Sequence, residues 1–152
     1  MAVVDYFLKL DGIDAGPGTH KGEIQLDSFS WGVSNTAVTP GQPGKASAHD
    51  FDFVAKSTIA SPKLMVACAT GMHIKEANLT AITTGLKGTQ TTLMKIRMLD
   101  VLVSSYQNSG SDAPTQPANV DDSPMDSVNL GYRSLEFTFG TVTGTMTPGA
   151  PT

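Results

Sequence analysis

Only one stretch of this chain has the periodicity of an α-helix, and it limits the fold because the remainder follows the two-residue period of β-strands. Residues 61–73 read SPKLMVACATGMH. Ser61 is a suitable N-cap, Pro62 fits the first helical position, and Gly71 stands where a left-handed C-cap residue belongs. The sequence therefore predicts a single short helix in a chain that is otherwise a sheet.

The predicted helix has one apolar face. At about 100° per residue, this face collects Leu64, Met65, Cys68 and Met72. The opposite side collects Lys63, Ala67 and Thr70. We expect the helix to pack on the rim or flank of the sheet, with Pro62, Leu64, Met65, Cys68 and Gly71 as its structural residues.

The composition indicates one domain with few charges. The 152 residues are 39% hydrophobic and only 16% charged, against roughly 25% charged residues in an ordinary soluble domain. The net charge of −4 argues against nucleic-acid binding, which needs a basic surface. The chain lacks the run of roughly 18 apolar residues that a membrane span requires, and its start, MAVVDYFLKLDG, lacks the basic region of a cleavable signal peptide. We therefore expect neither membrane insertion nor a cleaved signal.

Alternating apolar and polar residues predict antiparallel strands along the rest of the chain. The strand signals cover residues 4–10, 23–32, 49–54, 76–85, 89–106 and 127–140. In three of them the apolar face changes sides, partway along 23–32, near Leu99 and near Arg133, which is typical of β-bulges. About seven strands with such changes, together with one helix, predict a small barrel or sandwich.

The segment 33–48, VSNTAVTPGQPGKASA, is predicted to form a long protruding hairpin. It holds a single charge, Lys45, and turns around Pro40 to Gly44. Exposed strand edges are normally protected by charged residues, so we expect this edge to be paired, and another copy of the chain is the simplest partner. Residues 107–124 predict a mobile, mildly acidic loop, and residues 141–152 predict a weak strand or a frayed tail.

The histidines and the cysteine do not predict a metal or catalytic site. His20, His49 and His73 lie far apart in the sequence and lack the spacing of a known metal motif. Cys68 falls on the apolar face of the helix, where a small buried hydrophobe is a simpler interpretation than a nucleophile. Trp31 is more simply a packing or interface anchor than a ligand platform. No catalytic, metal or cofactor-binding residue is therefore predicted.

Asp50 and Asp52 are the remaining chemical candidates. They lie two residues apart on a strand, so they share one face and could serve as the acid and base of a hydrolase. A solvated polar face opposite Phe51 and Phe53 explains the same pattern without chemistry.

Five segments occur in order along nearly the whole chain, from about Val3 to Phe139. They are YFLKLDGI, HKGEIQLDSFSWGVS, SPKLMVACATGMHIKEANLT, LDVLVSSY and SVNLGYRSLEFTF. Each segment alone is a weak signal, but the ordered set is specific. The set resembles the Hcp family, the haemolysin-coregulated tube proteins of bacterial type VI secretion systems.

The resemblance implies a mainly β fold: a small antiparallel β-barrel with one flanking α-helix and a long protruding hairpin loop. The whole of residues 1–152 would be a single Hcp-like tube domain. The resemblance further implies a homohexameric ring, with rings stacked into a tube inside a contractile sheath. A spike of the valine-glycine-repeat type would cap the tube, and secreted effectors would ride in its lumen.

The resemblance also implies where the protein works. It is expected in the bacterial cytoplasm when assembled, and then in the medium or a target cell after contraction, without a cleaved signal peptide. The family is not enzymatic unless an effector domain is fused to it. No such domain, no enzymatic activity and no cofactor are expected here.

Two sets of residues are expected to act in the assembly. The predicted main contact between copies is the hairpin tip, Thr39, Pro40, Gly41, Gln42, Pro43, Gly44 and Lys45. Ser28 and Ser30 alternate with Phe29 and Trp31 along one strand, so the serines face the channel if the aromatic rings pack inward. Small uncharged groups there would hold cargo weakly enough to release it.

Two alternative functions remain open from the sequence. One is a ligand- or carbohydrate-binding β-sandwich that uses the acidic loop within residues 107–124. The other is a hydrolase that depends on Asp50 or Asp52.

Overall fold

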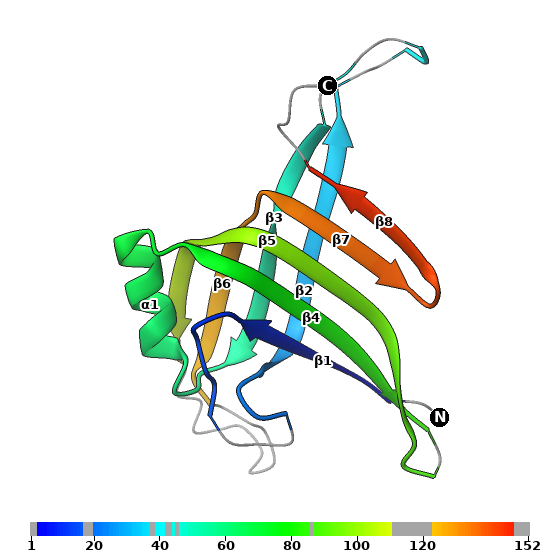
Figure 1. Ribbon diagram of the computed structural model, residues 1–152. Coiled ribbons are helices and arrows are strands. Elements are labelled where there is room, and N and C mark those ends of the chain that lie inside the picture. Colours follow the sequence, from blue (N-terminus) through cyan, green and yellow to red (C-terminus); the bar gives the residue numbers. More distant parts are fainter. Residues whose placement is uncertain are drawn as a thin grey trace.

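Antiparallel strands make up most of the molecule. The computed structural model describes residues 3–16, 20–36, 39–41, 44, 46–85, 87–110 and 123–147. Its elements, shown in Figure 1, are β1 (Val3–Leu10), β2 (Ile24–Asn35), β3 (Ala46–Lys56), α1 (Ser61–Thr70), β4 (Ile74–Thr84), β5 (Gln90–Ser109), β6 (Met125–Gly131), β7 (Ser134–Phe139) and β8 (Val142–Met146). The predicted fold class, mainly β with one helix, is confirmed.

The first six strands in the sheet order close into a ring. That order is β4-β1-β2-β3-β6-β5-β7-β8, and β4 also pairs with β5. The pairing of β4 with β5 joins the two ends of the six-stranded part, so β7 and β8 branch from β5 as a hairpin outside the ring. Figure 1 shows the β2–β3 hairpin projecting beyond the barrel at the top of the view.

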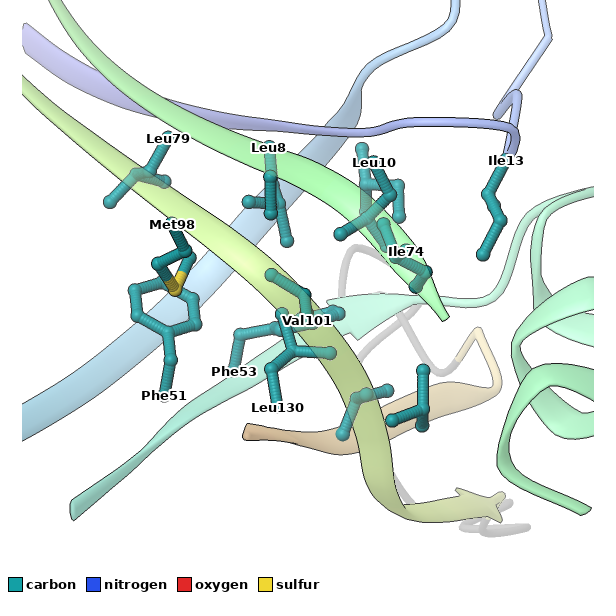
Figure 2. Packing of buried hydrophobic residues seen from close by; sticks show 14 of the residues in the cluster. Leu8, Leu10, Ile13, Phe51, Phe53, Ile74, Leu79, Met98, Val101 and Leu130 are labelled. Carbon is teal, nitrogen blue, oxygen red and sulfur yellow. The ribbon is translucent and has the colours of Figure 1, made fainter. Parts of the chain in front are cut away.

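Alternate residues of the strands fill the barrel. Leu8 of β1, Phe51 of β3 and Met98 of β5 have no exposed surface, and Phe53 is 2% exposed. Figure 2 shows side chains from these different strands converging on one centre. Each large apolar side chain buried in this way contributes about 1.5–3 kcal/mol to stability.

Bulges account for the predicted changes of the apolar face. In β2 the pairing with β3 shifts between Leu26 and Ser28, so the inward positions pass from Leu26 to Phe29. In β5, Asp100 adopts a left-handed φ of 53°, and the inward positions pass from Met98 to Val101. Each extra residue moves the side chains that follow to the opposite face of the strand.

The predicted strand 127–140 is two strands, which corrects the sequence interpretation. β6 ends at Gly131, and β7 begins at Ser134. β6 pairs with the second half of β5, whereas β7 pairs with the first half. The backbone N–H of Arg133 donates to the carbonyl of Leu99 at 3.0 Å, which fixes the corner between them beside the β5 bulge.

Strands extend into two segments for which the sequence predicts a loop and a weak strand or frayed tail. The loop assigned to 107–124 begins later, because β5 continues to Ser109 and pairs with β6. Most of that loop, residues 111–122, lies outside the described residues. Of the two alternatives for residues 141–152, a weak strand or a frayed tail, the strand is present as β8, which pairs with β7 along its whole length. In both cases a neighbouring strand supplies the hydrogen bonds that extend the element.

The helix α1 lies on the flank of the barrel against β5, as expected (Figure 1). Gly71 is its left-handed C-cap with φ 68°, as predicted, and Pro62 stands in the first turn but at the second helical position rather than the first. Ser61 is not the N-cap, because Ala60 occupies that position and Ser61 is already helical.

The buried face of α1 differs from the predicted one. Its buried residues are Ser61, Leu64 and Ala67. Met65 is 53% exposed, so its prediction as a core residue was wrong, and Cys68 is only half-buried. The polar Ser61 is one of the buried residues. Because the prediction considered only apolar residues, it placed the buried face on a different side of the helix.

A buried carboxylate explains why Ser61 faces inward. Asp126 of β6 is 3% exposed. Its carboxylate accepts hydrogen bonds from Ser57 Oγ at 3.0 Å, Tyr106 OH at 2.8 Å and Asn108 Nδ2 at 2.9 Å. The hydroxyl of Ser61 donates to it as well. Four neutral donors thus connect the start of α1 with the ends of β3 and β5 and the start of β6.

These donors determine the charge state of the carboxylate. Burial by itself would raise the pKa of Asp126, but the hydrogen bonds from Ser61, Asn108 and Tyr106 favour the ionised form and leave its pKa below the ordinary value. Burial, together with the bond to this carboxylate, raises the pKa of the Tyr106 hydroxyl. At neutral pH, the ionised Asp126 and the protonated Tyr106 are therefore both favoured.

The neighbouring residues Leu64 and Met65 give a matched pair for testing the face of α1. Leu64→Ala should lower the free energy of unfolding by about 2–5 kcal/mol, because it opens a cavity under the helix. Met65→Ala should change it by less than about 0.5 kcal/mol, because the side chain is largely in water. Urea unfolding followed by circular dichroism measures both values, and equal losses would contradict the assigned face.

Asp126→Ala should lower the free energy of unfolding by about 3 kcal/mol at pH 7, because it leaves buried donors without an acceptor. Since the pKa of Asp126 is lowered in the folded protein, its stabilisation is present above the pKa of unfolded aspartate, about 3.9. The stabilisation is lost as the pH falls through the pKa that Asp126 has in the folded protein.

Urea unfolding of wild type and Asp126→Asn at pH 7 and at pH 3 tests this dependence. The difference in free energy of unfolding between the two proteins should be smaller at pH 3 than at pH 7. Asp27→Ala removes an exposed carboxylate from β2 and serves as the control, with no more than about 0.5 kcal/mol of change expected. A difference that is the same at both pH values would show that the charge of Asp126 is not what stabilises the site.

Candidate interaction surface

The β2–β3 hairpin extends past the strands that would otherwise pair with it. β1 pairs with β2 only over residues 24–26, and β6 pairs with β3 only over residues 51–56. Beyond these points the two strands pair with each other as far as Asn35 and Ala46. The predicted pairing within segment 33–48 is therefore present.

The predicted contact residues lie at the tip of this hairpin. Thr39, Pro40, Gly41 and Gly44 are exposed. Gln42, Pro43 and Lys45 lie outside the described residues. The structure thus shows an accessible tip, and its role as an oligomer contact stays a prediction.

The two faces of β2 differ as the sequence predicted. Phe29 packs inward, with its ring centroid 5.0 Å from that of Tyr6. The Trp31 ring meets Phe137 of β7 edge-on, at 5.4 Å and 83°. Ser28 and Ser30 on the opposite face are exposed. The serines are therefore accessible on the face of β2 opposite the aromatic rings.

An apolar groove with a volume of about 390 Å³ lies between β2 and the β7–β8 hairpin. Its main lining residues are Trp31, Val33, Phe137, Phe139, Val142 and Met146. Several are strongly exposed for apolar side chains: Val33 at 51%, Phe139 at 53% and Val142 at 73%. A concentration of exposed apolar surface of this kind marks an interaction site.

Sequence reasoning missed this groove, although a weak strand was one of its two interpretations of residues 141–152. The groove requires β8 to fold beside β7, which places Val142 opposite Phe139 and Met146 opposite Leu135. The alternation in TVTGTM, residues 141–146, is the signal that supports the strand interpretation. No local signal could have shown that β2 lies across from it.

The structure separates the three histidines. The ring of His20 stacks on that of Phe7, with the ring centroids 3.8 Å apart, and His20 Nδ1 lies 3.1 Å from Glu23 Oε2. The backbone carbonyl of His49 accepts from Tyr132 OH at 2.8 Å. In the described part of the chain, no three histidine, cysteine, aspartate or glutamate side chains gather in a way that could hold a metal ion.

The carboxylate candidates lie on the exposed face of β3. Asp50 accepts a hydrogen bond from Ser104 Oγ at 2.8 Å, and Asp52 stands opposite Ser30 in the β2–β3 register. Burial, and secondarily the charge of Asp50, raises the pKa of Tyr132. Both aspartates are exposed, so the described geometry offers no enclosed pocket around them for hydrolysis. The acidic loop of the alternative ligand-binding function falls within residues 111–122, outside the described residues.

A family model described as "Type VI secretion system effector, Hcp" matches residues 7–139. The chain belongs to the Hcp family. The resemblance found in the sequence is thereby confirmed, and this Hcp chain is assigned to type VI secretion.

Solved structures agree with this assignment. Hcp1 from Salmonella typhimurium is 29% identical over 95% of this chain and 92% of its own, with a TM-score of 0.71. Hcp2 from the same organism is 25% identical over 97% of this chain and 98% of its own, with a TM-score of 0.70. A crystal structure of another Hcp protein, 16% identical, shares the fold with a TM-score of 0.79 over 94% of this chain and 98% of its own.

Among curated protein sequences, none matches the chain. In the described part of this Hcp chain, the helix is neither long nor apolar enough to cross a membrane.

Proposed function

We propose that this Hcp chain is a structural tube subunit of a type VI secretion system, rather than an enzyme. It would form homohexameric rings that stack into a tube, and the tube would be expelled. The observation that carries the proposal is the projecting β2–β3 hairpin, which extends beyond its partners in the barrel. The family match over residues 7–139 supports it.

The partners follow from this role. The tube would assemble in the bacterial cytoplasm inside a contractile sheath and beneath a spike of the valine-glycine-repeat type, and contraction would move it out of the cell. Effectors would travel in the lumen. We place Ser28 and Ser30 on the lumen wall, because they are exposed while the aromatic residues between and beside them pack inward.

Removal of the hairpin tip tests the contact between copies. Replacing residues 39–45 by Asn-Gly keeps a tight turn but removes the surface that would reach a neighbour. Rings and tubes should be lost, or should form only at higher protein concentration, as measured by light scattering and negative-stain imaging. Met65→Ala on α1 is the control and should assemble normally. Unchanged rings and tubes in the shortened chain would refute the contact.

A bulky side chain at Ser30 tests the lumen assignment. Ser30→Phe should reduce the amount of small secreted proteins that copurify with tagged rings from the native bacterium, because it narrows the channel and makes its wall apolar. The ring itself should remain intact, and Ser30→Thr should load normally. Mass spectrometry of the copurified proteins provides the measurement, and normal loading of Ser30→Phe would place this residue elsewhere.

A further inference from the structure

The helix α1 is attached to the barrel through few side chains. Its buried residues are Ser61, Leu64 and Ala67, whereas Met65 is 53% exposed and Val66 is 50% exposed. Each strand, in contrast, is joined to at least one neighbour by a ladder of backbone hydrogen bonds. Folded proteins open locally where buried apolar contacts are few. The helix can therefore leave the barrel without breaking the pairing between strands.

The helix also has little stability of its own. It spans 10 residues, and isolated helices shorter than about 12–15 residues are marginal in water. Within the described residues, no side chain caps its start, its first turn has no acidic residue and its last turn has no basic residue. It thus lacks the usual stabilisation of helix ends. We expect α1 to unwind when it leaves the barrel, so that detachment and unwinding are one event.

The start of α1 is held by a hydroxyl that connects two parts of the chain. Ser61 Oγ accepts a hydrogen bond from the backbone N–H of Thr58 at 3.0 Å and donates to the carboxylate of Asp126. Ser61 is 7% exposed and Asp126 is 3% exposed. A hydrogen bond to a charged group contributes more than one between neutral groups. Detachment of α1 requires this bond to break.

The other donors to the carboxylate do not belong to the helix. Tyr106 OH, at 2.8 Å, and Asn108 Nδ2, at 2.9 Å, come from β5. Ser57 Oγ, at 3.0 Å, directly follows β3. Among the described donors, Ser61 is therefore the one that α1 contributes. Removing its hydroxyl weakens the attachment of α1 and leaves the bonds between the barrel and Asp126 in place.

The other end of α1 is held less firmly. Gly71 ends the helix in the left-handed conformation, and beyond it His73 Nε2 lies 2.8 Å from Asp100 Oδ1. These two side chains are 60% and 44% exposed, and exposed pairs of this kind contribute little to stability. The attachment of α1 thus depends mainly on its buried start and on Leu64.

We propose that α1 is a separate opening unit of the folded protein, and that the bond from Ser61 to Asp126 acts as its latch. In the open state, the helix is detached and unwound while the six-stranded ring stays closed. Opening brings Leu64, Ala67 and the half-buried Cys68 into water. This conformational device is independent of the proposed role in a tube, because every contact it uses lies within one chain.

Hydrogen exchange measured by mass spectrometry at pH 7 tests the opening unit. In the wild type, the amides of residues 64–70 should exchange faster than those of β4, which is paired on both sides and should exchange only through larger openings. Low concentrations of urea should accelerate exchange in β4 much more than in α1, because a local opening exposes less surface. Equal rates and equal urea dependence in α1 and β4 would overturn the separate unit.

Ser61→Ala tests the latch. Exchange in α1 should become faster by about tenfold or more, as expected for the loss of a hydrogen bond to a charged group, while exchange in β4 should stay within about twofold of wild type. Ser104→Ala is the matched control, because the Ser104 hydroxyl donates to Asp50 at 2.8 Å and to the carbonyl of Asn129 at 3.0 Å on an exposed surface. This control should exchange as the wild type does in both elements.

Asp126→Asn provides a second variant that keeps the shape of the side chain and removes its charge. It should also accelerate exchange in α1 more than in β4. All proteins are compared at a concentration where light scattering gives the same assembly state. Unchanged exchange in α1 of Ser61→Ala would overturn the latch, and equal acceleration of α1 and β4 in both variants would show that the helix opens only with the whole barrel.

Discussion

The pairing of β4 with β5 is the constraint on which the rest of the structure depends. It closes six strands into a barrel. Backbone hydrogen bonds join β4 to β5 along most of the length of β4. A closed ring has no room for further strands, so the chain that follows β6 must pair outside it. The β7–β8 hairpin is therefore displaced to the first half of β5, where it stands across from β2 and forms the groove.

The same closure makes the β2–β3 hairpin project. β1 leaves β2 after Leu26, and the pairing of β6 with β3 reaches only as far as Phe51, so in the described part of the chain no barrel strand pairs with the outer part of the hairpin. Two features that sequence separates by about a hundred residues thus come together at one end of the molecule. This end combines unpaired strand edges with exposed apolar side chains, which is why we propose contact between copies there.

The helix depends on a polar interaction rather than on its apolar face alone. The Ser61 hydroxyl donates to ionised Asp126, which places Ser61 against the barrel. The helix is therefore oriented with Leu64 and Ala67 buried and Met65 exposed. A buried charge must be hydrogen-bonded or paired. Here four neutral donors bind the one carboxylate, and no cation is needed. The site connects α1 to the barrel where β3 and β5 end and β6 begins.

Sequence alone determined the β class, the single helix with its Gly71 cap, the inward Phe51 and Phe53, and the hairpin around Pro40, because these follow from local periodicity and turn chemistry. It also placed the changes of face, since a bulge leaves its mark in the alternation of neighbouring residues. Only the tertiary structure decided the rotation of α1, the corner at Arg133 and the groove beside Trp31. Those features depend on which distant strand supplies a hydrogen-bond partner, and a linear pattern of apolar residues carries no information about that choice.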